Sequence, residues 1–317
     1  MSKKVDFFIV GAAKAGTTSL YHFLAQHPEV YMSPIKEPNY FADDIDLAAL
    51  RPEVQSRMKL LNIPDWLRGD MKNHIHRAFI RDPRQYEALF RFGEAARVRG
   101  EASASYLYSA TAAKNIAAYN PSAKIIMVLR NPVERAYSHY LMDQRMAVTD
   151  LSFEEALAVD AAQQPKSWGS TSLYLELGCY SHQVQRYLES FPKENILILL
   201  HEELKNNTSN TLRRVFSFLQ VDDTVEIATG EAHNTAAVPR NTLVKKLIGV
   251  NWFRVTVRRA LKKTFLKKFI KHTLFTKAEG EKLSPETAKR LRNYFRDDIA
   301  ALERLLQTDL SAWQQPR

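Results

Sequence analysis

The chain lacks several features that would place it in particular classes of protein. Its 317 residues include one cysteine, Cys179, so an intramolecular disulfide is excluded and a reducing compartment is indicated. No apolar stretch reaches the roughly 18 to 20 residues that a transmembrane helix needs. Internal repeats, low-complexity tracts and a Pro/Gly/Ser-rich linker are also missing. We therefore expect a cytoplasmic protein in which residues 1–317 form a single domain, with one domain plus a small helical appendage as the alternative.

Acidic residues are missing from one long stretch, residues 240–277. The whole chain has a net charge of +10 and this stretch holds twelve cations, so the remainder carries about −2. The twelve are Arg240, Lys245, Lys246, Arg254, Arg258, Arg259, Lys262, Lys263, Lys267, Lys268, Lys271 and Lys277. Apolar residues recur at every fourth position from Val257 to Phe269, which predicts a basic amphipathic helix over 255–271.

Two interpretations of this basic segment stay open. It could contact an anionic membrane surface, which would place the protein peripherally at the inner face of a membrane, or a polyanionic acceptor. Alternatively it is a helix that packs on the core and has a solvated basic face. Nucleic acid is not favoured as a partner, because no recognition module is visible.

The most informative residues present are 7–19, FFIVGAAKAGTTS. An apolar run predicts a strand, Gly11 and Gly16 bound a tight loop, and a helix expected from Thr17 onward directs unpaired N–H groups at an anion. In the related ATP/GTP loop G-x-x-x-x-G-K-[ST] a lysine stands where this chain has Thr17. The sequence therefore predicts a phosphate-binding loop with a changed ligand, formed by the residues Lys14, Ala15, Gly16, Thr17, Thr18 and Ser19.

A second anion-binding stretch covers residues 124–140, KIIMVLRNPVERAYSHY. An apolar strand leads into Arg130, and Asn131-Pro132 then begins a helix that carries Arg135 and Ser138. Arg130 supplies a bidentate fork for phosphate at the carboxyl end of the strand, and Ser138 adds a hydroxyl two helical turns later.

The third group of residues lies in MSPIKEPNYF, residues 32–41, where Lys36 and Glu37 follow a proline. A carboxylate at this position could accept the proton of an attacking hydroxyl or amine. A solvated Lys-Glu pair without a catalytic role is the alternative.

These stretches resemble the motifs of sulfotransferases that use 3′-phosphoadenylyl sulfate (PAPS). Lys14 to Thr18 match the Lys-x-Gly-Thr-Thr loop for the 5′-phosphosulfate, Leu129 to Ser138 match Leu-Arg-Asn-Pro-x-x-Arg-Ala-x-Ser for the 3′-phosphate, and Lys36 to Phe41 match the Lys-Glu-x-x-x-Phe segment of the bacterial and glycosaminoglycan-type branch. The resemblance spans nearly the whole chain. It implies transfer of a sulfuryl group from PAPS to a hydroxyl, or less readily an amine, of a glycan, lipid or small-molecule acceptor.

The resemblance also assigns roles to residues. Glu37 is expected to be the general base and Lys14 to stabilise the leaving phosphate, with no metal ion required. Arg240 lies where the family places its last nucleotide-contacting loop, and Tyr180 matches a tyrosine that lies near the nucleotide, although a core aromatic is the favoured interpretation there. Ala102 replaces a lysine that usually lies beside the acceptor, so the acceptor cannot be named.

The remaining pattern alternates short apolar runs with amphipathic stretches, which predicts a parallel sheet covered on both faces. Strands are expected at 5–10, 97–102, 124–129 and 195–200, and helices at 17–26, 110–119, 132–144, 180–190 and 207–219. Ser284-Pro285 begins a terminal helix over 284–308. Together with the family resemblance this predicts a three-layer α/β fold of the phosphate-loop type, with a central parallel sheet flanked by helices.

Other functions remain as alternatives. A phosphate-loop kinase would show Mg²⁺ dependence, and His201, Glu202 and Glu203 after the run at 196–200 could imitate its acidic metal ligand, although a helix start explains them as well. A nucleotide- or membrane-binding protein without chemistry would bind the adenosine bisphosphate product, PAP, without turnover. His74 and His76 are the next candidates for the base, and a zinc site there is not favoured because no Cys or carboxylate stands at ligand spacing.

Overall fold

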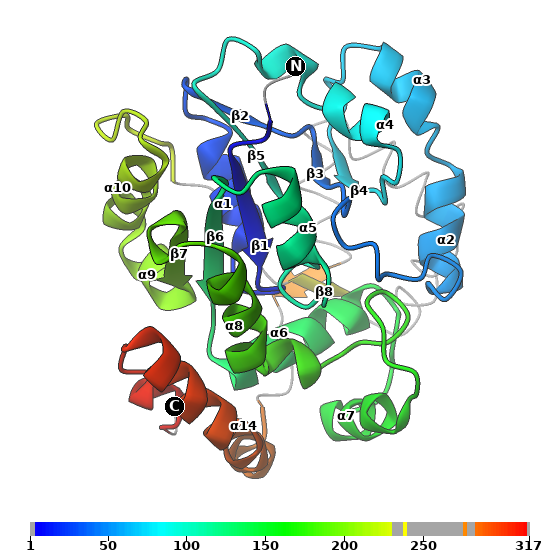
Figure 1. The fold of residues 1–317 in the computed structure, drawn as a ribbon. Helices are drawn as coiled ribbons and strands as arrows, with labels where there is room; N and C mark the ends of the chain where they lie inside the picture. The colour runs from blue at the N-terminus through cyan, green and yellow to red at the C-terminus, as the bar shows by residue number, and fades with distance from the viewer. Residues whose placement is uncertain (1–3, 230–236, 240–274, 278–282, 316–317) are drawn as a thin grey trace.

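The computed structural model describes residues 4–229, 237–239, 275–277 and 283–315. Its centre is a parallel sheet of five strands in the order β2-β5-β1-β6-β7 (Figure 1). The strands are β1 (Phe7–Gly11), β2 (Val30–Met32), β5 (Val98–Ala102), β6 (Lys124–Leu129) and β7 (Ile196–Leu200). The parallel sheet expected from the sequence is confirmed.

The strands form where apolar residues run without interruption. Every residue of β1 is buried, as are Ile125 to Leu129 of β6, because helices cover both faces of the sheet. Four of the five strands fall within two residues of the ranges that the sequence predicts. The fifth, β2, has only three residues, which is too short for an apolar pattern to reveal.

Six helices lie where the sequence predicts them. They are α1 (Thr17–Leu24), α5 (Ala112–Tyr119), α6 (Pro132–Arg145), α8 (Tyr180–Ser190), α10 (Thr208–Leu219) and α14 (Pro285–Leu306). The Ser284 hydroxyl accepts a hydrogen bond from the Thr287 N–H at 3.1 Å, so the predicted N-cap of the terminal helix is confirmed. None of the helices within the described ranges is long and apolar enough to cross a membrane.

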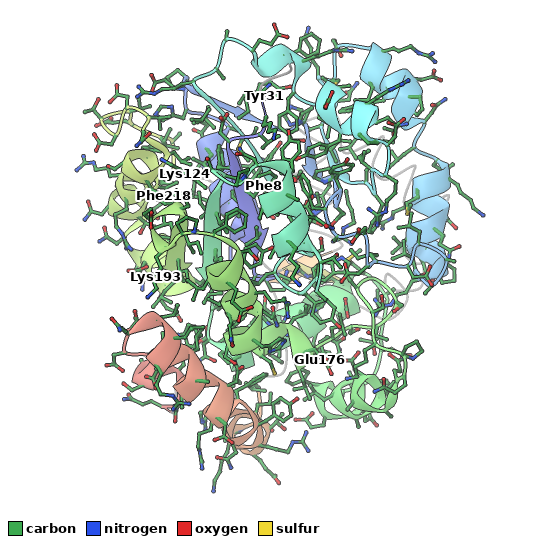
Figure 2. The ribbon with its side chains drawn as sticks, in the orientation of Figure 1. Phe8, Tyr31, Lys124, Glu176, Lys193 and Phe218 are labelled. Carbon is green, nitrogen blue, oxygen red and sulfur yellow. The ribbon has the colours of Figure 1, made fainter. Side chains whose placement is uncertain are left out.

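The terminal helix packs on the body of the protein through both polar and apolar contacts. Leu291, Phe295 and Leu302 on one face of α14 are buried. The Asp298 carboxylate accepts from the Tyr180 N–H at 2.7 Å and thus caps the start of α8. Lys124 at the start of β6 lies over the Phe218 ring of α10 at 5.3 Å, and this contact holds the helix against the strand (Figure 2).

An insertion between β2 and β5 is the part of the fold that the sequence pattern misses. It holds a two-stranded parallel sheet and three short helices, all at one side of the molecule (Figure 1). The elements are β3 (Ile35–Glu37), α2 (Pro52–Lys59), α3 (Ile63–Arg68), β4 (Ile75–Arg77) and α4 (Pro83–Ala88). A further unpredicted helix, α7 (Phe153–Ala162), follows α6. The insertion matters because β3 carries Glu37.

The topology of the main sheet fixes where a ligand can bind. From β1 the chain moves toward β2 on one side, and from β6 it moves toward β7 on the other. Adjacent parallel strands whose connections diverge in this way leave a crevice at their carboxyl ends, which is where ligands bind in open α/β sheets. The predicted phosphate loop follows β1, and Arg130 follows β6.

One further pair of strands is described, β8 (Ala237–Pro239) and β9 (Phe275–Lys277), which are antiparallel. Arg240 and the predicted basic helix 255–271 lie outside the described residues.

The sheet interior supplies a test of this packing. Gly100 of β5 lies opposite Phe7 of β1, and a Cβ at this position would lie only 2.2 Å from the tip of the Phe7 ring. Gly100→Ala should therefore lower the free energy of unfolding by roughly 1 to 3 kcal/mol, as overpacking of a core does. Urea denaturation measures this, with Gly69→Ala as the control, because a Cβ there meets nothing nearer than the Trp66 carbonyl at 3.4 Å. Equal stability of the two variants would contradict the packing.

Candidate active site

The loop after β1 turns sharply before α1 begins. The Ala12 N–H donates to the Val128 carbonyl at 2.7 Å, which ties the start of the loop to β6. Lys14 has φ 67° and Gly16 has φ 105°, both in the left-handed region that side chains rarely adopt. A strained non-glycine residue persists only where its surroundings hold it, and such residues cluster at functional sites.

The amino end of α1 is open to an anion. Gly16 precedes this helix, and among the described residues no side chain caps its first N–H groups. The start of α6 differs, because the Asn131 side chain accepts hydrogen bonds from two backbone N–H groups there. The first turn of α1 therefore combines free donors with the positive end of the helix dipole. Thr17 is buried, and Thr18 and Ser19 are half-buried in the same turn.

The structure brings Arg130 to the phosphate loop, as the sequence predicts. Its Nη1 donates to the Lys14 carbonyl at 3.2 Å, and its Nη2 lies 3.3 Å from the Glu134 carboxylate. The Arg130 carbonyl accepts from the Tyr180 hydroxyl at 3.0 Å, so Tyr180 is a fully buried core aromatic that steadies this turn. Ser138 lies half-buried on the same helix, α6.

Lys14 faces α6, where its Nζ lies 3.6 Å from the Met142 sulfur. Burial lowers the pKa of Lys14 to about 8, and the nearby charges of Arg145 and Arg130 add to the effect. Among the described residues Lys14 forms no ion pair. An arriving anion would relieve this crowding of positive charge.

The sequence does not reveal that His201 supports the loop. His201 begins α9 (His201–Asn206), and its Nδ1 lies 2.9 Å from the carbonyl of the buried Ala15. The Glu203 carboxylate accepts from the Leu200 N–H at 3.0 Å, so these residues form a helix start. Of the two interpretations that the sequence left open for 201–203, the helix start is confirmed.

Glu37 is buried and held by two cations. Its Oε1 lies 2.9 Å from the Lys36 Nζ and its Oε2 lies 2.8 Å from the Arg77 Nε. Burial alone would raise the pKa of Glu37, but the charges of Lys36 and Arg77 hold it well below its ordinary value. The pair is therefore no solvated surface contact, and Arg77 is a partner that sequence reasoning missed. It lies directly opposite Glu37 in the β3–β4 pair.

His139 is a largely buried imidazole, with 13% of its side chain exposed. It lies on α6 against the Tyr174 ring, and its Nε2 is 3.9 Å from the Asp143 carboxylate. Burial lowers the pKa of His139 well below its ordinary value, and four cations add to this. They are Arg135, Lys14, Arg51 and Arg77. Lys14 from the loop after β1 and Arg77 beside Glu37 both contribute to the lowering of this pKa.

The other candidate residues lie as follows. His74 and His76 are exposed, and His76 stands in β4 next to Arg77. Ala102 is buried at the end of β5. Arg240 and the basic segment lie outside the described residues, apart from the backbone of 275–277, so their predicted roles stay predictions.

Comparison with known proteins decides the family. The family profile described as the sulfotransferase domain matches residues 4–301. The chain belongs to the sulfotransferase family. A solved relative, the sulfotransferase from Alicyclobacillus acidocaldarius, is 27% identical with a TM-score of 0.72 and covers 99% of this chain and 100% of its own. This sulfotransferase therefore has the α/β fold that the sequence predicts.

Two curated relatives are considerably longer proteins. Carbohydrate sulfotransferase 15 of Mus musculus is 29% identical over 251 residues, which are 68% of this chain and 43% of the relative. The bifunctional heparan sulfate N-deacetylase/N-sulfotransferase 2 of Homo sapiens is 30% identical over 220 residues, 68% of this chain and 22% of the relative. The chain thus spans less than half the length of either.

The crowding around Lys14 predicts how anion binding depends on pH. Below pH 8 the Lys14 amine is charged and attracts a phosphate, and above pH 8 it loses its proton. The affinity for PAP should therefore fall as the pH rises through 8, approaching tenfold per pH unit. Isothermal titration calorimetry between pH 7 and 9.5 measures this. Lys14→Arg should remove the pH dependence, because an arginine stays charged. An affinity that stays constant in the wild type would contradict the role of Lys14.

Proposed function

We propose that this sulfotransferase moves a sulfuryl group from PAPS to a hydroxyl of a carbohydrate acceptor, with an amine as the lesser alternative. The observation that carries the proposal is that the open loop after β1, with Arg130 bonded to it, lies at the same edge of the sheet as the turn after β5, to which the segment following the buried Glu37 is bonded. The names of the curated relatives, which specify carbohydrate and heparan sulfate, support a glycan as the acceptor class.

The donor fits the residues at the end of the sheet. The open first turn of α1 would receive the 5′-phosphosulfate, with Thr17, Thr18 and Ser19 adding hydroxyl donors. Arg130 and Ser138 would hold the 3′-phosphate, because a guanidinium and a hydroxyl match its oxygens. ATP- and GTP-binding loops have a lysine at the position that Thr17 occupies here. This difference argues against the kinase alternative.

The reaction is an in-line displacement at sulfur. The acceptor oxygen forms the new S–O bond while the bond between sulfur and the bridging phosphate oxygen breaks, and PAP leaves. Lys14 stabilises the negative charge that grows on the leaving phosphate. Glu37 takes the proton from the acceptor hydroxyl.

The two cations on Glu37 shape its role as a base. They keep the carboxylate ionised over the physiological range and make it weakly basic. A weak base suits a hydroxyl that becomes strongly acidic only as its oxygen bonds to sulfur. Arg77 is partly exposed, with 37% of its side chain open to solvent. Its ion pair with Glu37 can therefore change when an acceptor binds.

Transfer from ³⁵S-labelled PAPS to a panel of acceptors tests the function. The panel holds desulfated chondroitin and heparosan, phenols, sterols and lipids, and each is assayed with and without EDTA. We expect label on a glycan and no loss with EDTA. Label on phenols or lipids alone would overturn the acceptor class. Transfer of phosphate from ATP, with strict Mg²⁺ dependence, would overturn the reaction in favour of a kinase.

The base and the charge stabiliser should separate in a kinetic comparison. Glu37→Gln should lower kcat by roughly 10² to 10⁴ and leave PAP affinity near normal, whereas Lys14→Ala should damage both. Glu53→Gln at the exposed start of α2 is the matched control for the charge change. A Glu37→Gln enzyme with near wild-type turnover would move the base elsewhere, and His76 would then be the next residue to test.

A further inference from the structure

A second buried carboxyl, Glu101 of β5, lies outside the reaction described above. It is fully buried and accepts hydrogen bonds from three hydroxyl groups. The distances are 2.8 Å from Tyr106, 3.1 Å from Tyr86 and 3.3 Å from Ser103. Burial raises the pKa of Glu101 to about 8. Within the described residues no cation forms an ion pair with it, in contrast to Glu37.

Two of these hydroxyl groups have a second partner in the segment that follows Glu37. The Tyr106 hydroxyl accepts from the Phe41 N–H at 3.2 Å, and the Ser103 hydroxyl accepts from the Asn39 N–H at 3.2 Å. Tyr86 differs: its hydroxyl bonds Glu101, and its ring stacks on Tyr40 at 4.2 Å. Glu101 thus fixes the orientation of two hydroxyls that in turn hold backbone N–H groups.

Asn39 passes this constraint to Glu37. The Asn39 amide donates to the Glu37 carbonyl and to the Ala78 carbonyl, both at 2.8 Å, and accepts from the Ser105 hydroxyl at 2.6 Å. Asn39 itself has φ 51°, a conformation that its surroundings must maintain. The segment 37–41 is therefore bonded to Glu101 through side chains that extend from β5 and the turn after it.

Ring packing also holds this segment, because the Phe41 ring contacts the rings of Phe8, Tyr40, Tyr86, Tyr106 and Tyr119. The Phe41 ring meets the Phe8 ring of β1 edge-on at 5.4 Å, at the centre of the sheet where Figure 2 labels Phe8. An apolar ring contact keeps the Phe41 side chain buried, but it is not directional. A hydrogen bond, in contrast, fixes the orientation of the peptide group that makes it. The hydroxyls on Glu101 fix the direction of the Asn39 and Phe41 N–H groups, while Arg81 and Asn115 donate to the carbonyls of the same two residues.

We propose that Glu101 is a positioning residue for sulfuryl transfer, which acts through Ser103 and Tyr106 on the backbone of residues 39–41 and so aims the Glu37 carboxylate at the acceptor hydroxyl. The proposal rests on the role of Glu37 proposed above. The carboxyl group of Glu101 serves as the acceptor in this network, because one oxygen accepts from both tyrosines while the other accepts from the Ser103 hydroxyl.

A matched pair of variants tests the proposal. Tyr106→Phe and Tyr86→Phe each remove one hydroxyl from the same oxygen of Glu101 and keep the ring, but only Tyr106 reaches the Phe41 N–H. Tyr106→Phe should lower kcat roughly 10- to 100-fold, as a small misplacement of a catalytic group does, with PAP affinity unchanged. Tyr86→Phe should stay within about twofold of the wild type. The assay is ³⁵S transfer to the acceptor that the wild type uses in the panel.

Amide hydrogen exchange gives a readout that needs no acceptor. The Phe41 amide should exchange faster in Tyr106→Phe and at the wild-type rate in Tyr86→Phe. Equal kcat values or equal exchange rates in the two variants would overturn the proposal, because a merely stabilising network would treat the two hydroxyls alike.

Substitutions of Glu101 itself complete the test. Glu101→Gln should keep kcat within a few-fold of the wild type, since the amide oxygen still accepts from both tyrosines, while Glu101→Leu should lose these hydrogen bonds. A Glu101→Gln enzyme as slow as Tyr106→Phe would contradict the proposal, and this result stands even where the leucine variant fails to fold. If Tyr106→Phe keeps the wild-type kcat while Glu37→Gln is inactive, only the proposal for Glu101 is overturned. If Glu37→Gln is active, Glu37 is not the base and both proposals are overturned.

Discussion

The parallel pairing of β1 with β6 is the constraint on which the rest of the structure depends. The two strands run side by side to one edge of the sheet, and the Ala12 N–H continues the ladder onto Val128 at 2.7 Å. Their chain continuations then diverge, and the turn with Arg130 bonds the loop with Lys14 at this edge. Two sequence segments more than a hundred residues apart come into contact because of this backbone geometry.

The two halves of the site differ in their balance of charge. At the loop after β1, burial lowers the pKa of Lys14, and the nearby charges of Arg145 and Arg130 lower it further. The buried carboxylate of Glu37 has a cation at each of its two oxygens, so its negative charge is already compensated. The surroundings of Lys14 therefore favour an anion. A neutral hydroxyl can approach Glu37 without leaving a buried charge unpaired.

Short-range patterns in the sequence predict the elements that carry the donor motifs. The strands before Lys14 and Arg130 are apolar runs, and the helices after them begin with recognisable residues. The insertion escapes such reasoning because β3 and β4 have three residues each and α2 buries no side chain. Arg77 meets Glu37 only through the β3–β4 pairing, and His201 meets Ala15 only through the order of the main sheet. Contacts of this kind leave no local signal.

The carboxyl-terminal turn has a consequence for where this enzyme can be shortened. The Asn131 side chain, which caps α6 immediately after Arg130, donates to the Trp313 carbonyl at 3.1 Å, and the Trp313 ring lies 6.2 Å from that of Tyr180. The residues around 313 thus pack against the turn that carries Arg130. A fragment that stopped at residue 301, where the family match ends, would lose these contacts of Trp313. A fusion partner or affinity tag should therefore be placed after Trp313.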